Sequence, residues 1–328
     1  MGMDSHVTLA ANAASLGRTA AACLAAALTC LVTGPFVIAW LKRTFTERIV
    51  SDSATLNALH AGKQGTPTLG GILIVAALTT GFSLCSDASL TARLLAIVVA
   101  NSFGLLGAID DWIKATTKQQ GLTVRQKLTG QTVLALGTAV ALTAQQPASP
   151  DLNRLTQISL ALWFAFVMVA ACNAVNLTDG LDGLAAGSTA LCAAALATIF
   201  LKTEATLATG QQAAVLAAAA AAFLWFNRYP ARVFMGDTGA FAMGATLGLL
   251  CLQARREWLL CTAGAVFAVE TLSVIAQVAW FRCTRRRLLL CSPLHNHFVF
   301  QRIAEQRIVR AFWIAGILAA TATVLQAG

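Results

Sequence analysis

Residues 91–114 read TARLLAIVVANSFGLLGAIDDWIK, a largely apolar run that ends in two adjacent aspartates. A helix needs about 20 apolar residues to cross the hydrocarbon core of a bilayer, so residues 91–109 predict a transmembrane helix. Nine further segments have the same character: 20–41, 69–86, 128–146, 156–172, 183–201, 209–226, 233–251, 258–281 and 309–327. The sequence therefore predicts an all-α polytopic integral membrane protein with about ten transmembrane helices.

The composition supports this class. Hydrophobic residues make up 57% of the 328-residue chain, charged residues only 11%, and the mean hydropathy is +0.70. Soluble domains carry about 25% charged residues, so a soluble or disordered chain is excluded. No polar stretch is long enough for a second domain, and we expect a single transmembrane domain over residues 1–328. The net charge of +9 comes without basic stripes interleaved with aromatics, so no nucleic acid partner is expected.

The basic residues predict the topology. Of the 23 Lys and Arg residues, 17 fall in the connections after the first, third, seventh and ninth segments. Because cationic loops tend to stay in the cytoplasm, we expect that side to be cytoplasmic, with both chain termini outside the cytoplasm.

Five polar motifs lie on this cytoplasmic side, and ionisable groups near bilayer depth are costly and usually functional. The motifs are KQGTPTLGG (63–71), DDWIK (110–114), NAVNLTDGLDG (173–183), NRYPARVFMGDTG (227–239) and PLHNHF (293–298). We expect their carboxylates, among them Asp110, Asp182 and Asp237, to meet in one pocket at this face. Carboxylates without thiolates or a histidine cage favour Mg²⁺ or Mn²⁺. Taken singly, each motif has a plainer explanation: a solvated helix end for Asp110 and Asp111, a capped turn for Asp179 and Asp182, a turn for the glycine-rich run, and a loop hydrogen bond for His295 and His297.

Together and in this order, the motifs closely resemble those of the bacterial phospho-N-acetylmuramoyl-pentapeptide transferases, which belong to the polyprenyl-phosphate N-acetylhexosamine-1-phosphate transferase superfamily. The likeness runs from about residue 42 to 320. It implies a ten-helix membrane enzyme, a homodimer, that uses Mg²⁺ at the cytoplasmic face. The implied reaction transfers phospho-MurNAc-pentapeptide from UDP-MurNAc-pentapeptide to undecaprenyl phosphate, giving lipid I and UMP.

The resemblance also implies roles for individual residues. Asp110 and Asp111 match the paired catalytic aspartates, Asp237 the magnesium ligand and His295 the first residue of the histidine motif. Asp182, Asn227 and Phe234 match a uracil pocket, with Phe234 stacking on the base. The remaining matches are to substrate or phosphate contacts: Lys63, Thr68, Lys114, Asn173, Asn176, Asp179 and His297.

The chain departs from the family pattern in the histidine motif. Most relatives read PLHHHFE, whereas Asn296 replaces the middle histidine and Val299 the glutamate. Asn can form hydrogen bonds but cannot carry a proton near pH 6.5. Leu69 and Ala240 are milder departures, from Met and Ser.

Three alternatives remain at this level. A sister enzyme that transfers GlcNAc-1-phosphate would share the metal site. A non-catalytic paralogue would bind UDP-sugar or lipid without releasing UMP. A transporter would place its ionisable groups near the middle of the membrane, whereas these motifs lie at one face.

Overall fold

The fold is entirely helical in the computed structural model, which describes residues 2–45, 65–117, 119–144 and 154–327. No strand occurs among these residues, so the predicted all-α class is confirmed. The helices are α1 (Gly2–Thr44), α3 (Gly71–Ser83), α4 (Leu90–Thr116), α5 (Val124–Ala144), α6 (Arg154–Thr178), α7 (Leu184–Phe200), the 3₁₀ turn η2 (Glu204–Thr206), α8 (Leu207–Asn227), α9 (Gly236–Gln253), α10 (Leu259–Thr262), α11 (Ala265–Thr284), α12 (Leu294–Phe300) and α13 (Glu305–Ala327).

Each of the ten predicted segments overlaps a helix, but one segment corresponds to two helices rather than one. The segment 258–281 is divided into the short α10 and the longer α11. The break lies at Gly264, where a Cβ would meet the carbonyl oxygen of Leu260. This division lets α11 take its own direction after α10.

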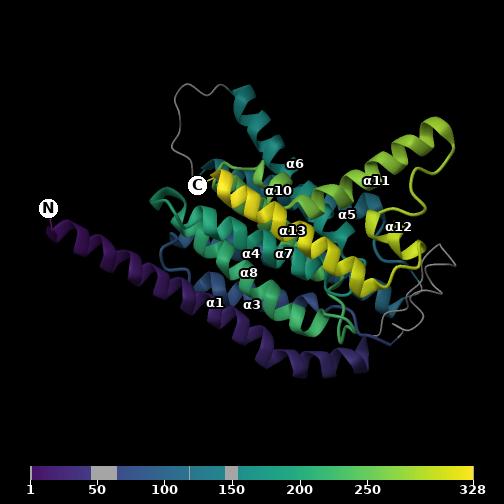
Figure 1. The fold of residues 1–328 in the computed structure, drawn as a ribbon, viewed down its shortest axis with the longest axis horizontal. Coiled ribbons are helices and arrows are strands. Elements are labelled where there is room, and N and C mark those ends of the chain that lie inside the picture. The colour runs from purple at the N-terminus through teal and green to yellow at the C-terminus, as the bar shows by residue number, and fades with distance from the viewer. Residues whose placement is uncertain (1, 46–64, 118, 145–153, 328) are drawn as a thin grey trace.

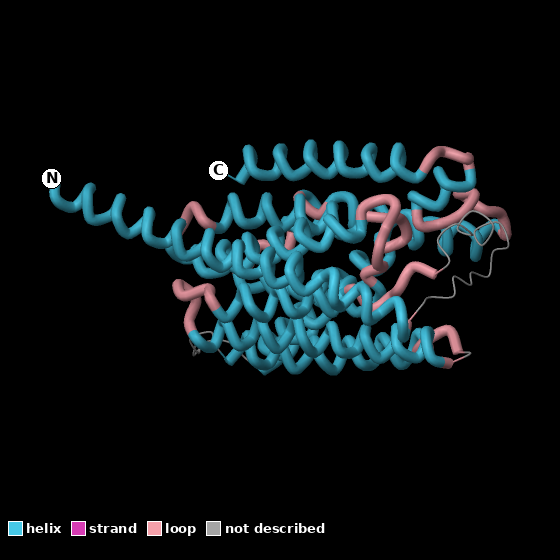
Figure 2. Tube along the Cα trace, turned by 90° about the horizontal axis from the view of Figure 1, so that it is seen from below, coloured by secondary structure: helices cyan, strands magenta, loops and turns pink. Residues whose placement is uncertain are grey.

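The helices form a multi-pass membrane bundle. Among the described residues, six helices are long and apolar enough to cross a membrane: residues 14–44, 90–116, 154–178, 204–227, 265–284 and 305–327. Most helices run side by side in about the same direction, with loops gathered at the two ends (Figure 2). The start of α1 and the end of α13 lie toward the same end, and α12 lies toward the other (Figure 1).

Helix α9 lies at the centre of the bundle. All its residues from Asp237 to Leu252 are buried, and it packs most extensively against α4 and α6. Small residues make this possible: a Cβ on Gly244 would lie 2.7 Å from the carbonyl oxygen of Ala171 in α6. On α4, Gly107 lies directly against the backbone of Asp237 and Thr238. Close approach through glycine is a common way for membrane helices to pack, and here it brings the ends of α4 and α9 together.

A polar network ties the other end of the bundle together. Asp87, in the turn between α3 and α4, accepts hydrogen bonds from Ser15, Arg18 and Gln211. Burial by itself would raise the pKa of Asp87, but these hydrogen bonds and the charge of Arg18 outweigh it and hold the pKa below its ordinary value. Its carboxylate therefore stays ionised at neutral pH and holds α1, α8 and the start of α4 together.

The glycine contact between α4 and α9 predicts a stability difference. In Gly107→Ala the added methyl group has no room against the α9 backbone, and overpacking of this kind costs about 1–3 kcal/mol. We expect a melting temperature lower by a few degrees in detergent, measured by thermal unfolding followed by size-exclusion chromatography.

The matched control is Gly137→Ala in α5, where a Cβ would meet nothing within 4 Å. It should leave the melting temperature unchanged or raise it slightly, since Ala is the better helix former. Equal melting temperatures for the two variants would contradict the assigned packing.

Candidate active site

Two aspartates lie inside α4 rather than beyond its end. The sequence predicted that the helix stops at residue 109, but it continues through Asp110 and Asp111 to Thr116. Both side chains are buried, with exposed fractions of 0% and 1%. A helix supplies its own backbone hydrogen bonds, so it can extend beyond its apolar stretch where a partner receives the polar side chains. Here that partner is the start of α9.

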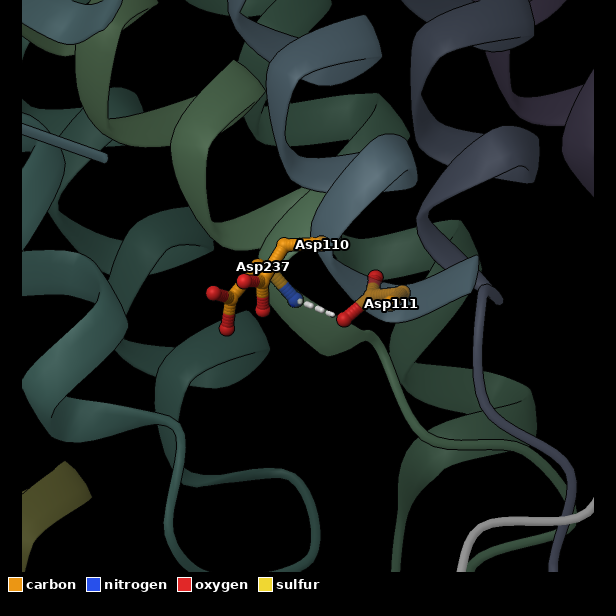
Figure 3. Close-up of side chains that lie close together, drawn as sticks. All are labelled: Asp110, Asp111 and Asp237. Carbon is orange, nitrogen blue, oxygen red and sulfur yellow. Dashed lines mark hydrogen bonds between the residues drawn. The ribbon is translucent and has the colours of Figure 1, made fainter. Parts of the chain in front are cut away.

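The two aspartates of α4 meet Asp237 of α9. Each of the three offers a carboxylate oxygen, and these atoms lie within 4.8 Å of one another. The side chains come from two neighbouring helices and converge at the N-terminal end of α9 (Figure 3). The convergence of the DDWIK and GDTG motifs that the sequence predicted is thus present in the structure.

Asp111 caps the N-terminus of α9. Its Oδ1 accepts the backbone N–H of Asp237 at 3.0 Å, and its Oδ2 accepts the backbone N–H and the hydroxyl of Thr238 at 2.9 and 2.6 Å. The residue at the N-cap of α9, Met235, provides no side-chain cap of its own. Helix N-termini carry unpaired N–H groups and a partial positive charge, so this carboxylate is well placed there.

Glycine at position 236 is required by this cap. Gly236 has a φ of +68°, a backbone conformation that favours glycine. A Cβ at this position would also collide with Oδ2 of Asp111. Any larger residue at position 236 would displace the Asp111 carboxylate from the N-terminus of α9.

Two lysines lie between Asp110 and Asp237. The Nζ of Lys114 lies 2.7 Å from Oδ2 of Asp110 and 3.4 Å from Oδ1 of Asp237. The Nζ of Lys127, at the start of α5, lies 2.9 Å from Oδ2 of Asp110 and 2.6 Å from Oδ2 of Asp237. With all five groups ionised, the cluster carries one net negative charge.

The connection between α4 and α5 also covers Asp110. The backbone N–H of Leu122 donates to Oδ1 of Asp110 at 2.6 Å. Its neighbour Gly121 has a φ of +90°, and a Cβ there would lie 2.5 Å from the same oxygen. The chain therefore passes directly over the carboxylate.

Two asparagines of α6 extend the cluster on another side. Asn176 donates from Nδ2 to Oδ1 of Asp237 at 2.9 Å. One turn earlier, Asn173 donates to Oε1 of Gln131 in α5 at 2.7 Å. Asn176 is therefore part of the carboxylate site, whereas Asn173 ties α6 to α5 beside it.

The predicted uracil-pocket residues hold the loop between α8 and α9. Asn227 accepts the N–H of Gly183 at 3.1 Å and donates to the carbonyl of Val233 at 3.0 Å. Asp182 accepts the N–H of Ala231 at 2.9 Å. Phe234 follows in this loop, half-buried, and its backbone N–H donates to Pro67. Asp179 is half-buried in the same turn as Asp182.

His295 of α12 is buried against the turn that carries Asp179 and Asp182. Its backbone N–H lies 3.1 Å, and its Nδ1 3.2 Å, from the carboxylate of Glu270 in α11. A Cβ on Gly180 would collide with its Nε2. That nitrogen is buried and has no hydrogen-bond partner among the described residues.

His297 hydrogen-bonds to the loop before α12 and to the end of α12. Its Nδ1 accepts the N–H of Leu290 at 3.1 Å, and its Nε2 lies 3.0 Å from the side-chain amide of Gln301. The structure thus shows this residue holding the loop between α11 and α12. Thr68 is buried just before α3, with its N–H directed at the carbonyl of Phe45, and Lys63 lies outside the described residues.

Sequence reasoning missed two residues of this region. Lys127 was counted only as a topological charge, and Glu270 received no role. Glu270 did carry a signal, since it is an acidic residue within an apolar segment. Nothing in the sequence separates Lys127 from the other basic residues of its loop, because its role depends on the way α5 returns toward α9.

The carboxylates fit a hard divalent cation. Their donor atoms are all oxygens, and Mg²⁺ is bound through one or two carboxylates together with phosphate oxygens and water. The two ammonium groups inserted between Asp110 and Asp237 show that this site attracts positive charge. Asp237 and Asp110 can hold such an ion, with Asp111 next to them.

Comparisons with known proteins agree with this geometry. The family described as Glycosyl transferase family 4 matches residues 93–255. The phospho-N-acetylmuramoyl-pentapeptide-transferase of Desulforudis audaxviator (strain MP104C) is 40% identical over 319 residues, covering 89% of this chain and 93% of the relative. The enzyme of the same name from Moorella thermoacetica is 40% identical, covering 90% and 95%, and that from Solidesulfovibrio magneticus is 39% identical, covering 92% and 90%. With such identity over nearly its whole length, the chain belongs to the phospho-N-acetylmuramoyl-pentapeptide-transferase family.

Proposed function

We propose that this protein transfers phospho-MurNAc-pentapeptide from UDP-MurNAc-pentapeptide to undecaprenyl phosphate, giving lipid I and UMP. The observation that carries the proposal is the buried meeting of Asp110, Asp111 and Asp237 with two lysines at one end of a membrane bundle. Relatives that carry the name of this activity cover about nine tenths of the chain.

The reaction brings together two anions, a nucleotide diphosphate and a lipid phosphate. Asp237 and Asp110 would hold Mg²⁺, which would supply charge neutralisation and Lewis-acid polarisation of phosphate oxygens. Lys114 and Lys127 supply two further positive charges, which can pair with phosphate oxygens in place of the carboxylates. Phosphoryl transfer depends mainly on positioning and on charge stabilisation, and the protein provides both at this point.

The remaining residues act on the substrates. Asp110 deprotonates or orients the lipid phosphate, whose oxygen forms a bond to the sugar-bearing phosphorus as the bond to UMP breaks. Asp111 acts through the cap that fixes Asp237. We assign Asp182, Asn227 and Phe234 to the uracil, and His295 to a phosphate through its free Nε2. Phosphate or sugar contacts are assigned to Lys63, Thr68, Asn173, Asn176, Asp179 and His297.

The orientation in the membrane follows from the charges. The protein is a multi-pass inner-membrane protein, and we propose that the end with the carboxylates is cytoplasmic and that both termini lie outside the cytoplasm. The terminal helices α1 and α13 have their outer ends toward one end of the bundle, as this orientation requires (Figure 1). We further propose that residues 1–328 act as one transmembrane domain and that the protein works as a homodimer.

Removal of the Asp237 carboxylate tests the proposed reaction. In Asp237→Asn we expect UMP release to fall about 10²- to 10³-fold, as is typical when one group that stabilises transition-state charge is lost. The assay uses purified protein, UDP-MurNAc-pentapeptide, undecaprenyl phosphate and Mg²⁺, with UDP-GlcNAc as a second donor.

The control is Asp87→Asn, the same substitution in the turn before α4, which should lower stability but keep nearly full turnover per folded molecule. Near-normal UMP release by Asp237→Asn would refute the assignment. A preference for UDP-GlcNAc by the unmodified protein would favour the sister reaction.

The contact between Glu270 and His295 predicts a second effect. In Glu270→Ala the two N–H groups of His295 lose their acceptor in a buried site, so the imidazole is no longer oriented. Loss of such an orienting partner typically costs about 10- to 100-fold in activity. We expect turnover to fall by that amount, with partial recovery in Glu270→Gln, which keeps one acceptor oxygen. If both variants kept full turnover, His295 would have no part in the reaction.

Asn296 allows a test in the opposite direction. It lies half-buried in the first turn of α12, between the two histidines. We expect Asn296→His to raise turnover by less than about tenfold, since an acid–base group that carries a reaction contributes about 10²–10⁴-fold and His295 is retained. The two proteins are compared in the same UMP assay across pH 6 to 9. A gain above about 10²-fold would mean that the natural protein is catalytically impaired.

A further inference from the structure

A cavity lined by both charged and apolar side chains lies at the far end of α11. It is formed by the last turns of that helix, the loop at 285–293 and the end of α12. Its volume is about 430 Å³. Two guanidinium groups line it, from Arg282 of α11 and Arg287 of the loop. Its apolar walls are Val278, Phe281, Leu290 and Phe300. None of these residues belongs to the carboxylate site.

The chain around this cavity has no negative charge of its own. Between Glu270 and Glu305 the sequence contains no Asp or Glu, yet it contains Arg282, Arg285, Arg286, Arg287 and Arg302. None of these arginines forms an ion pair with any residue that the structure describes. A guanidinium keeps its charge at any physiological pH. Arg282 and Arg287 are also exposed, so an anionic group of another molecule can reach both.

The position of α11 indicates which kind of molecule this is. The helix projects out of the bundle, and the chain turns back from its far end to reach α12 (Figure 1). The buried residues of α11, Val266, Phe267 and Glu270, all lie in its first two turns. Beyond them the helix exposes large apolar side chains, and two of these, Val278 and Phe281, also form walls of the cavity. The apolar walls thus continue into a surface that faces lipid, so a ligand with both an anionic head and an apolar tail matches it.

The cavity is held open by hydrogen bonds within the chain. The side-chain oxygen of Gln277 accepts the N–H groups of Leu288 and Leu289 at 3.1 and 2.8 Å. On the other side of the loop, His297 accepts the N–H of Leu290, and Arg287 donates to the carbonyl of Leu290 at 3.2 Å. The loop that carries Arg287 is therefore fixed to both α11 and α12 before any ligand arrives.

We propose that this cavity binds the phosphate headgroup of an anionic glycerophospholipid from the surrounding bilayer. Arg282 and Arg287 pair with the phosphate, and the apolar walls receive the first part of the acyl chains. The lipid is a resident of the bilayer and does not react, because His295 turns away toward Glu270 and Gly180 and no lining residue reaches the three aspartates. The proposal does not depend on the reaction assigned above.

Native mass spectrometry of the delipidated full-length protein tests the proposal. Phosphatidylglycerol, phosphatidylcholine and undecaprenyl phosphate are titrated separately and in competition. We expect phosphatidylglycerol to bind in preference to phosphatidylcholine, and Arg282→Gln with Arg287→Gln to weaken it by about fivefold for each arginine removed. The matched control is Arg285→Gln with Arg286→Gln, which removes the same charge from the same loop without touching the cavity lining.

Two further variants separate binding from folding. Arg282→Lys with Arg287→Lys keeps the charge and should keep most of the binding, while Val278→Trp fills the cavity without changing charge and should remove it. The proposal is overturned if the two glutamine pairs weaken binding equally, if phosphatidylcholine binds as tightly, or if Val278→Trp has no effect. It is also overturned if undecaprenyl phosphate displaces phosphatidylglycerol from the cavity at equal concentration.

Discussion

The carboxylate of Asp111 at the N-terminus of α9 is the contact on which the site depends. It accepts the first N–H groups of α9 and the hydroxyl of Thr238, and so fixes where α9 begins relative to α4. Asp237 lies in that first turn, one residue before Thr238, so its side chain is placed by the same contact. Gly107 and Gly236 leave room for the approach. A buried helix end without a cap would leave N–H groups unpaired at high cost, and one acidic residue therefore both stabilises the fold and positions the metal ligand.

The charges of the cluster explain why its carboxylates can be buried together. Three aspartates at this separation repel one another, and burial strengthens the repulsion because the surroundings are less polarisable than water. Lys114 and Lys127 offset most of it and leave one net negative charge. A divalent cation at the same carboxylates would change that net charge to one positive, which suits a site that receives phosphates. With both lysines still present, the site can thus accept a metal while its net charge stays at one unit in either condition.

The sequence predicted the helices and motifs that form this site better than it predicted the contacts between those helices. Hydrophobicity alone predicted ten segments that each overlap a helix, although only six described helices are long and apolar enough to cross a membrane. The chemistry of the motifs predicted that Asp110 and Asp237 would meet. It did not predict that α4 continues to Thr116, since polar residues at the end of an apolar run look like a loop until the partner helix is known. Lys127 was missed for the same reason. The break at Gly264 was missed because the apolar pattern passes through it without interruption.

The lysines of the carboxylate site and the arginines at the end of α11 differ in their partners. At the buried start of α11, Glu270 holds His295 against the turn that carries Asp179 and Asp182. The lysines of the site, Lys114 and Lys127, have acidic partners in Asp110 and Asp237. At the exposed end of α11, the arginines have no acidic partner in the described chain. Gln277 and His297 fix the loop after this end to α11 and to α12. The lysines of the site are thus paired with carboxylates of the same chain, whereas the arginines at the far end of α11 are available to anions outside it.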